Sequence, residues 1–138
     1  QRTSPAPPRL AAGDGGAFCN RVDDDGGAGE VRWGVPLPEL AAVPRTAPAG
    51  GAVLADHVVV EPGRGAVVEA AAAPGASGGA LSVVTDLGRR YVLADRDVLA
   101  MLGYANVRPL RLPAGLVSLV PAGATLDPAA ARAVAAPA

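Results

Sequence analysis

The chain has 138 residues, enough for one domain or for part of a larger protein, and its 18 glycines and 14 prolines divide it into short segments. A formal net charge of −1 excludes the long-range electrostatic field that recruits nucleic acid or an anionic membrane. Lysine and isoleucine are absent, and there is only one phenylalanine, one tryptophan and one methionine, so that valine, leucine and alanine must fill any core.

The N-terminal third predicts one β-hairpin between two irregular segments. Residues 1–15 lack periodicity and are predicted to form a flexible lead-in. Residues 17–22 are predicted to form a strand, 23–29 a turn and 30–35 a second strand, in which apolar and polar side chains alternate as in a half-buried strand. A connector rich in proline, glycine and alanine follows at residues 44–51.

Cys19 is the single cysteine and lies in the first predicted strand. It can be a small buried apolar side chain, or one half of a disulfide whose other half lies outside this sequence, and the residues alone leave both interpretations open. A catalytic thiolate is the least favoured interpretation, because the single histidine, His57, is distant in sequence.

The middle of the chain predicts a second pair of strands. Residues 57–60 and 66–69 are rich in valine, and between them Pro62-Gly63 suits the centre of a type II turn, since Gly63 can adopt positive φ. Residues 70–79 are predicted to be a linker of small residues.

A hairpin is predicted over residues 81–85 and 89–93. The loop between them contains Asp86 and Gly88, with Gly88 placed where a left-handed conformation is needed. Tyr91 lies in the second of these strands, and we expect it and Tyr104 to pack the hairpin onto the helices that follow, with their hydroxyls near the surface.

Three short helices are predicted after this hairpin. Asp95 suits the N-cap of a helix through Leu102, and Gly103 suits its C-terminal stop. A second helix is predicted to begin near Pro113, a favourable first-turn proline. The buried faces of these two helices are predicted to be Val98, Leu99, Met101 and Leu102, and then Leu116, Val117, Leu119 and Val120.

The third helix is predicted to begin with Asp127 as its cap and Pro128 as its first residue, and to run to about Val134. The predicted fold class is therefore α+β, strand-rich with antiparallel hairpins and short C-terminal helices.

No complete catalytic, cofactor or metal site is predicted. A phosphate-binding loop needs a lysine, which the chain lacks. Asp23, Asp24, Asp25 and Glu30 fail the spacing of a calcium loop and are interpreted as a solvated turn. His57 beside Asp56 has no nucleophile positioned by sequence and is interpreted as a surface histidine at a strand start.

Short motifs occur in a fixed order at residues 81–92, 97–104, 109–113 and 121–128, with residues 58–67 and Phe18-Cys19 upstream. In this order they resemble the C-terminal end of the EccB family, a core membrane subunit of the type VII (ESX) secretion systems of actinobacteria. The resemblance covers roughly residues 16–134. After Val120-Pro-Ala-Gly123 the chain departs from the Leu-Pro-x-Gly-Pro turn usual in that family, because Ala124 follows.

The resemblance implies a protein with a small cytoplasmic N-terminus, one transmembrane helix and a large extracytoplasmic part. Because the sequence has no initiator methionine, signal peptide or long apolar run, we expect it to be a fragment of such a protein. Residues 16–76 would close a central β domain and residues 77–138 would form the C-terminal repeat. The resemblance also implies that Cys19 pairs with a cysteine far upstream.

The function that this resemblance implies is structural: an extracytoplasmic assembly module without a cofactor, anchored to the cell membrane through the upstream helix. The implied partners are other EccB copies, the EccC, EccD and EccE subunits and the mycosin protease, and no nucleic acid. Two alternatives come from other classes: a cell-wall (peptidoglycan) binding module, and part of a subunit with ATPase activity.

Overall fold

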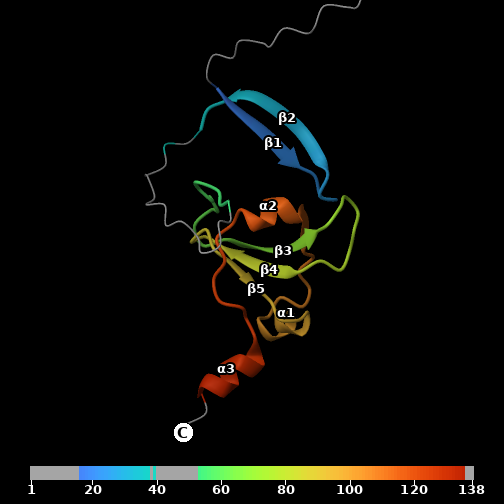
Figure 1. The fold of residues 1–138 in the computed structure, drawn as a ribbon, viewed down its shortest axis with the longest axis vertical. Helices are drawn as coiled ribbons and strands as arrows, with labels where there is room; N and C mark the ends of the chain where they lie inside the picture. Colours follow the sequence, from blue (N-terminus) through green and yellow to red (C-terminus); the bar gives the residue numbers. More distant parts are fainter. Residues whose placement is uncertain (1–15, 38, 40–52, 136–138) are drawn as a thin grey trace, which may run out of the picture.

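The computed structural model describes residues 16–37, 39 and 53–135, so the predicted lead-in 1–15 and connector 44–51 lie outside the described residues. In the described part, a two-stranded hairpin and a four-stranded sheet are accompanied by three short helices (Figure 1). The α+β, strand-rich class predicted from the sequence is confirmed.

The hairpin consists of β1 (Ala17–Val22) and β2 (Ala28–Val35), which pair antiparallel as predicted. The Asp23 carboxylate closes the turn between them, since its Oδ1 accepts hydrogen bonds from the backbone N–H of Gly27 (2.6 Å) and of Asp25 (3.2 Å). The tip of the turn lies against the rest of the chain: Gly26 is buried, and the carbonyl of Asp25 accepts a hydrogen bond from the N–H of Gly75 (3.2 Å).

The larger sheet is mixed. Its strands are β3 (Gly65–Ala71), β4 (Leu81–Thr85), β5 (Arg90–Val92) and β6 (Leu110–Pro113), in the order β5-β4-β3-β6. The β3-β4 and β4-β5 pairs are antiparallel, whereas β3 and β6 pair parallel, which the sequence did not predict.

The predicted pairing of residues 57–60 with 66–69 is wrong. Both edges of β3 are occupied, by β4 and β6, so residues 57–60 have no edge of β3 with which to pair and are not a strand. They form instead an irregular segment, here called the strap. Just before this segment, Ala55 N–H donates a hydrogen bond to the Leu119 carbonyl (2.9 Å), which helps to hold the strap in place. The turn after the strap is as predicted, because Gly63 has a φ of 74° and Arg64 N–H bonds to the Glu61 carbonyl (2.9 Å).

The β4-β5 hairpin confirms the predicted loop. Gly88 has a φ of 68°, and its N–H bonds to the Thr85 carbonyl (3.0 Å), which is the three-residue turn that needs glycine at this position. Asp86 also has a tertiary role, because its Oδ2 accepts a hydrogen bond from the N–H of Gly63 (2.8 Å) and joins the two turns.

Helix α1 (Asp97–Met101) lies where it was predicted, but its N-cap residue is Arg96 and it ends at Met101, one residue before the predicted Leu102. Asp95 Oδ1 accepts hydrogen bonds from the N–H groups of Asp97 (2.8 Å) and Val98 (3.1 Å). Gly103 has a φ of 83°, its N–H bonds to the Ala100 carbonyl, and Tyr104 N–H bonds to the Leu99 carbonyl (2.7 Å). These two bonds form a Schellman motif, which stops the helix where the glycine predicts.

Helix α2 (Ala114–Ser118) begins one residue later than predicted. Pro113 is the last residue of β6 and the N-cap of α2, with a ψ of 133°, and not a residue of the first helical turn. Because proline has no N–H, it suits the end of the β3-β6 ladder, where it lies opposite Ala71.

Helix α3 (Pro128–Ala135) confirms both predicted starting residues. Asp127 Oδ1 accepts hydrogen bonds from the N–H groups of Ala129 (2.8 Å) and Ala130 (3.3 Å), and Pro128 occupies the first helical position.

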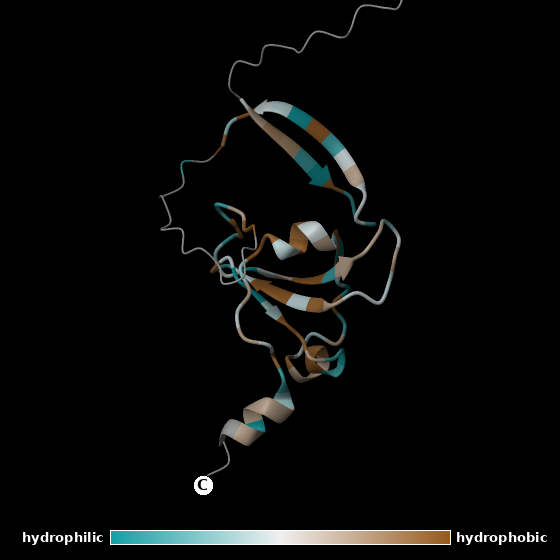
Figure 2. Ribbon diagram, in the orientation of Figure 1, coloured by the Kyte–Doolittle hydropathy of each residue, from teal (hydrophilic) through white to brown (hydrophobic). Residues whose placement is uncertain are grey.

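Two clusters of buried side chains form the core, one on each face of the larger sheet. Val67 and Val68 are consecutive on β3 and therefore point to opposite faces. Figure 2 shows apolar residues along both β3 and β4, and α1 and α2 lie on opposite sides of these strands in Figure 1. The first cluster is Val67, Leu93, Val98 and Leu99, and the second is Val68, Val84 and Val117.

The helices bury less than the sequence predicted. Val98 and Leu99 are buried as expected, but Met101 is 64% exposed and Leu102 is also exposed. On α2, Val117 is buried and Leu116 is exposed. Each helix is only five residues long, so only part of its predicted apolar face is buried against the sheet.

The segment from Val120 to Leu126 lies beside β5 and forms two isolated parallel bridges. Ala122 pairs with Arg90 of β5, and Leu126 pairs with Leu93, the residue after β5. Arg90 binds this segment through its side chain as well, because its Nε donates to the Val120 carbonyl (3.0 Å). The ring of Tyr91 packs on Gly123, as a β-carbon at Gly123 would lie 2.4 Å from Cε1 of the ring.

Substitution of Gly123 by alanine is therefore expected to lower the free energy of unfolding by about 1–3 kcal/mol, because the added methyl group overlaps the Tyr91 ring. Denaturant unfolding of the chain measures the change. In a Tyr91→Leu background the same substitution is expected to cost less, since the ring is gone. An equal cost in both backgrounds would show that the ring does not restrict residue 123.

Candidate functional site

An exposed apolar surface lies on one face of the β1-β2 hairpin. Phe18 lies opposite Trp33, and Asn20 opposite Val31, so all four side chains share one face of the hairpin. The Phe18 and Trp33 rings make an edge-to-face contact with centroids 6.1 Å apart. Phe18 is 65% exposed, Trp33 59% and Val31 53%. We call this surface the apolar hairpin face.

The prediction that β2 is half-buried is wrong, because seven of its eight residues are exposed. The alternation of apolar and polar residues is present, but nothing in the described part of the chain packs on the apolar side. A large apolar surface left in water at a well-defined strand pair is typical of an interaction site.

The opposite face of the hairpin is polar. Glu30 and Arg32 are two residues apart on β2, and Arg32 Nη2 donates a hydrogen bond to Glu30 Oε2 (2.8 Å). This hydrogen bond raises the pKa of the Arg32 guanidinium above its usual value. Cys19 lies opposite Arg32, is half-buried and is a free thiol here, so the disulfide implied by the resemblance stays a prediction.

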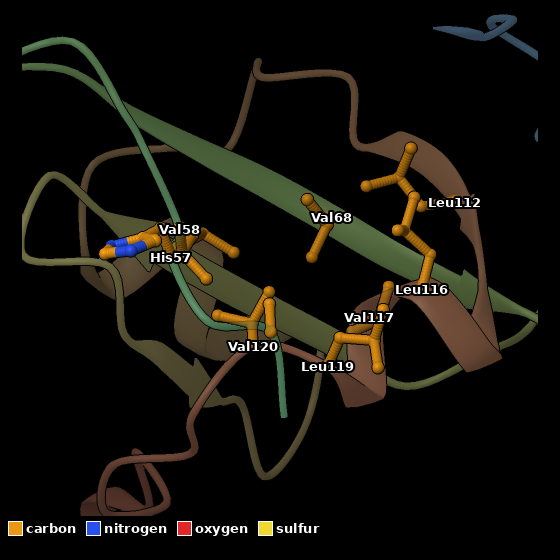
Figure 3. Close-up of a pocket in the computed structure, with 10 residues that line it drawn as sticks. His57, Val58, Val68, Leu112, Leu116, Val117, Leu119 and Val120 are labelled. Atoms are coloured by element: carbon orange, nitrogen blue, oxygen red, sulfur yellow. The ribbon is translucent and has the colours of Figure 1, made fainter. Parts of the chain in front are cut away.

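A second apolar feature is a pocket of about 210 Å³ between the larger sheet, α2 and the strap (Figure 3). Val68 of β3 lies at its centre, and Leu112 and Leu116 line one end of it. His57 lies at the other end and is exposed, as predicted, although the segment that carries it is not a strand. The lining offers apolar contacts and no arrangement of groups for acid–base chemistry.

Another pocket, of about 270 Å³, contains ionisable side chains, but two of these already have structural partners. Glu69 Oε1 accepts hydrogen bonds from Gly78 N–H (2.7 Å) and Gly79 N–H (3.2 Å), and Oε2 lies 3.8 Å from Arg111 Nε. Asp95 caps α1. In the described residues no group of His, Cys, Asp or Glu side chains is arranged to hold a metal ion.

The residues that the sequence singled out as structural are turn and cap residues on the one hand and two tyrosines on the other. The turns and caps described above are formed by Asp86, Gly88, Gly103 and Asp127. Tyr91 of β5 is half-buried and packs on Gly123. Tyr104 is exposed, so the expected packing of the hairpin onto the helices is wrong for Tyr104, and Tyr91 contacts Gly123, which lies between α2 and α3.

Sequence reasoning overlooked Glu69, which is only 7% exposed. Its signal was a single carboxylate within a valine- and alanine-rich strand, where a charge is retained only if it is paired.

A family model described as "Type VII secretion system ESX-1, transport TM domain B" matches residues 21–136. This match contains nearly all of the described structure, including the hairpin turn, the larger sheet and all three helices. No curated protein and no solved structure matches the chain. Among the described helices, none is long and apolar enough to cross a bilayer.

Proposed function

The chain belongs to the EccB family of type VII secretion subunits, and from this premise we propose that it is an extracytoplasmic assembly module of the secretion complex. In this proposal the side chains serve contact between proteins and not catalysis. The anchor of the module is a transmembrane helix upstream of residue 1, and the contacts are made outside the cytoplasm. We propose that residues 16–76 belong to a central β domain and residues 77–138 to a C-terminal repeat, with β3 joining the two parts because it pairs with β4 and β6.

The observation that carries the proposal is the apolar hairpin face. Phe18, Val31 and Trp33 are each more than half exposed on an antiparallel pair of strands, and aromatic side chains such as Phe18 and Trp33 dominate the energetics of protein interfaces. The strands hold them in a fixed arrangement, which lowers the entropy lost on binding.

The partners that we propose are other EccB copies, the EccC, EccD and EccE subunits and the mycosin protease. The alternatives each lack a supporting feature in the described residues. The carboxylates of the larger polar pocket are occupied by backbone N–H groups, which speaks against a nucleotide site there. The exposed aromatic pair is an edge-to-face contact and does not form a flat platform for a sugar ring.

Photo-crosslinking in native membranes tests the proposal. In the full-length protein, Asn20 is replaced by a benzophenone amino acid, because Asn20 shares the apolar face and its replacement leaves Phe18 and Trp33 intact. We expect crosslinks to subunits of the secretion complex, identified by mass spectrometry. The matched control is the same replacement at Arg64, an exposed side chain in a turn outside the hairpin, which is expected to give few or none.

Equal crosslinking at the two positions, or none at either, would contradict the assembly role. Sedimentation of the purified protein with peptidoglycan, lost on Trp33→Ala, would favour the wall-binding alternative instead.

A further inference from the structure

The outer edge of β2 has no strand beside it in the described residues, because the sheet order of the hairpin is β1-β2 alone. We propose that two copies of the chain pair antiparallel along β2, with the two-fold axis at Val31. The resulting four-stranded sheet has the order β1-β2-β2-β1. This proposal rests on the assembly function above and specifies one of its contacts: the surface, the partner and the register.

A further strand would stabilise the hairpin. An isolated two-stranded hairpin is at best marginally stable in water, and more strands with an apolar face, or packing against a helix, are needed for stability. β2 is eight residues long and exposed along nearly its whole length, and up to Gly34, whose φ is 72°, its edge offers a row of backbone donors and acceptors. The hairpin is held at its tip, by Gly26 and Asp25, which leaves the two strands accessible.

The charges on β2 select the register. With Val31 on the axis, Glu30 of each copy lies opposite Arg32 of the other copy, so that two opposite-charge pairs form by symmetry. A shift of two residues in one direction places Glu30 opposite Glu30, and in the other direction Arg32 opposite Arg32, and like charges directly opposite are destabilising. A shift of one residue places the apolar face of one copy beside the polar face of the other.

The same register joins the two apolar faces. Val31 meets Val31 of the other copy at the axis, and the Phe18–Trp33 pair of each copy flanks this contact on the same side of the sheet. Within one copy, the exposed Glu30 and Arg32 side chains form an ion pair. In the dimer, ion pairs between the two copies replace this pair. A second copy is therefore complementary to this edge both in charge and in apolar pattern.

Charge swaps test the pairing by sedimentation velocity of the full chain. Glu30→Arg and Arg32→Glu, each alone, are expected to weaken self-association roughly tenfold, because both pairs across the axis become repulsive. An equimolar mixture of the two variants is expected to associate at least as well as the parent chain, since every opposed pair is then attractive. The two single variants lose the same intrachain pair, so a merely structural role predicts no recovery in the mixture.

A thiol at the axis gives an independent readout. In the Cys19→Ser/Val31→Cys variant, the two Cα atoms opposite each other would be about 4.5–5.5 Å apart, within reach of a disulfide, and we expect rapid oxidation to a covalent dimer. In the control Cys19→Ser/Asn20→Cys, the thiols lie on the outer strands, roughly 14 Å apart, and we expect little dimer.

A monomeric parent chain, absence of recovery in the mixture, or equal oxidation of the two cysteine variants would overturn the pairing. If the pairing fails while Asn20 still crosslinks to other subunits in membranes, the assembly function stands and another strand covers the β2 edge. If both fail, the assembly function fails as well.

Discussion

The Gly79→Ala variant is expected to lose about 3 kcal/mol of unfolding free energy, because its β-carbon would make the closest approach among the described glycines. A β-carbon at Gly79 would lie 1.8 Å from the carbonyl oxygen of Ala70, which is closer than two non-bonded atoms can approach. The strand cannot retreat easily, because Ala70 N–H bonds to the Ala80 carbonyl (3.0 Å) and Glu69 Oε1 holds the N–H of Gly79. One of the two backbones must therefore move.

Denaturant unfolding of the chain, with the midpoint and slope fitted together, measures this loss. Gly115→Ala is the matched control, because Gly115 lies within α2 and a β-carbon there has no neighbour within 4 Å. Alanine favours a helix over glycine, so this control is expected to be neutral or to gain up to about 1 kcal/mol. If the two variants unfold at the same midpoint, the close approach of residues 70 and 79 is not a feature of the folded chain.

The Glu69→Ala variant is expected to lose about 2–3 kcal/mol, because it removes a nearly buried acceptor and leaves two backbone N–H groups without their partner. Arg111, one third exposed, also loses its nearest carboxylate. Glu69→Gln retains one side-chain oxygen that can accept both hydrogen bonds, so it is expected to lose clearly less than the alanine variant.

Unfolding measurements and hydrogen exchange together test this role. The amides of Gly78 and Gly79 are expected to exchange faster in Glu69→Ala, while amides in the core of β4 change only with global stability. Glu61→Ala is the control, because Glu61 makes only an exposed ion pair with Arg64 at 3.8 Å, and its loss is expected to be within about 0.5 kcal/mol. Equal effects at Glu69 and Glu61 would show that burial of the Glu69 carboxylate does not stabilise the loop.

Glu69 and Gly79 connect stability to the proposed function. They fix the loop between β3 and β4, and Gly75 of this loop holds the hairpin tip through the Asp25 carbonyl. The apolar hairpin face is therefore positioned by a chain of backbone contacts that ends in the larger sheet. A substitution that loosens the loop is expected to weaken the assembly contacts without touching Phe18 or Trp33.

Local chemistry explains which predictions held. Asp95, Gly103, Asp127 and Pro128 act within one helical turn of their own position, and Gly88 within one hairpin loop, so these features follow from side-chain reach and backbone sterics alone. The period-2 pattern likewise located β2, and β-rich runs on either side of a glycine-containing loop located the β4-β5 hairpin.

The sequence by itself thus determined the turns, the helix caps, the strand-rich class and, through the order of its motifs, the family. Only the tertiary structure decided that β3 pairs with β6, that residues 57–60 form a strap, that Glu69 is buried and that the hairpin face is open. The alternation of apolar and polar residues along a strand shows which side chains share a face, but it does not show what covers that face. Coverage and strand partners depend on contacts between residues far apart in the chain, which no local pattern encodes.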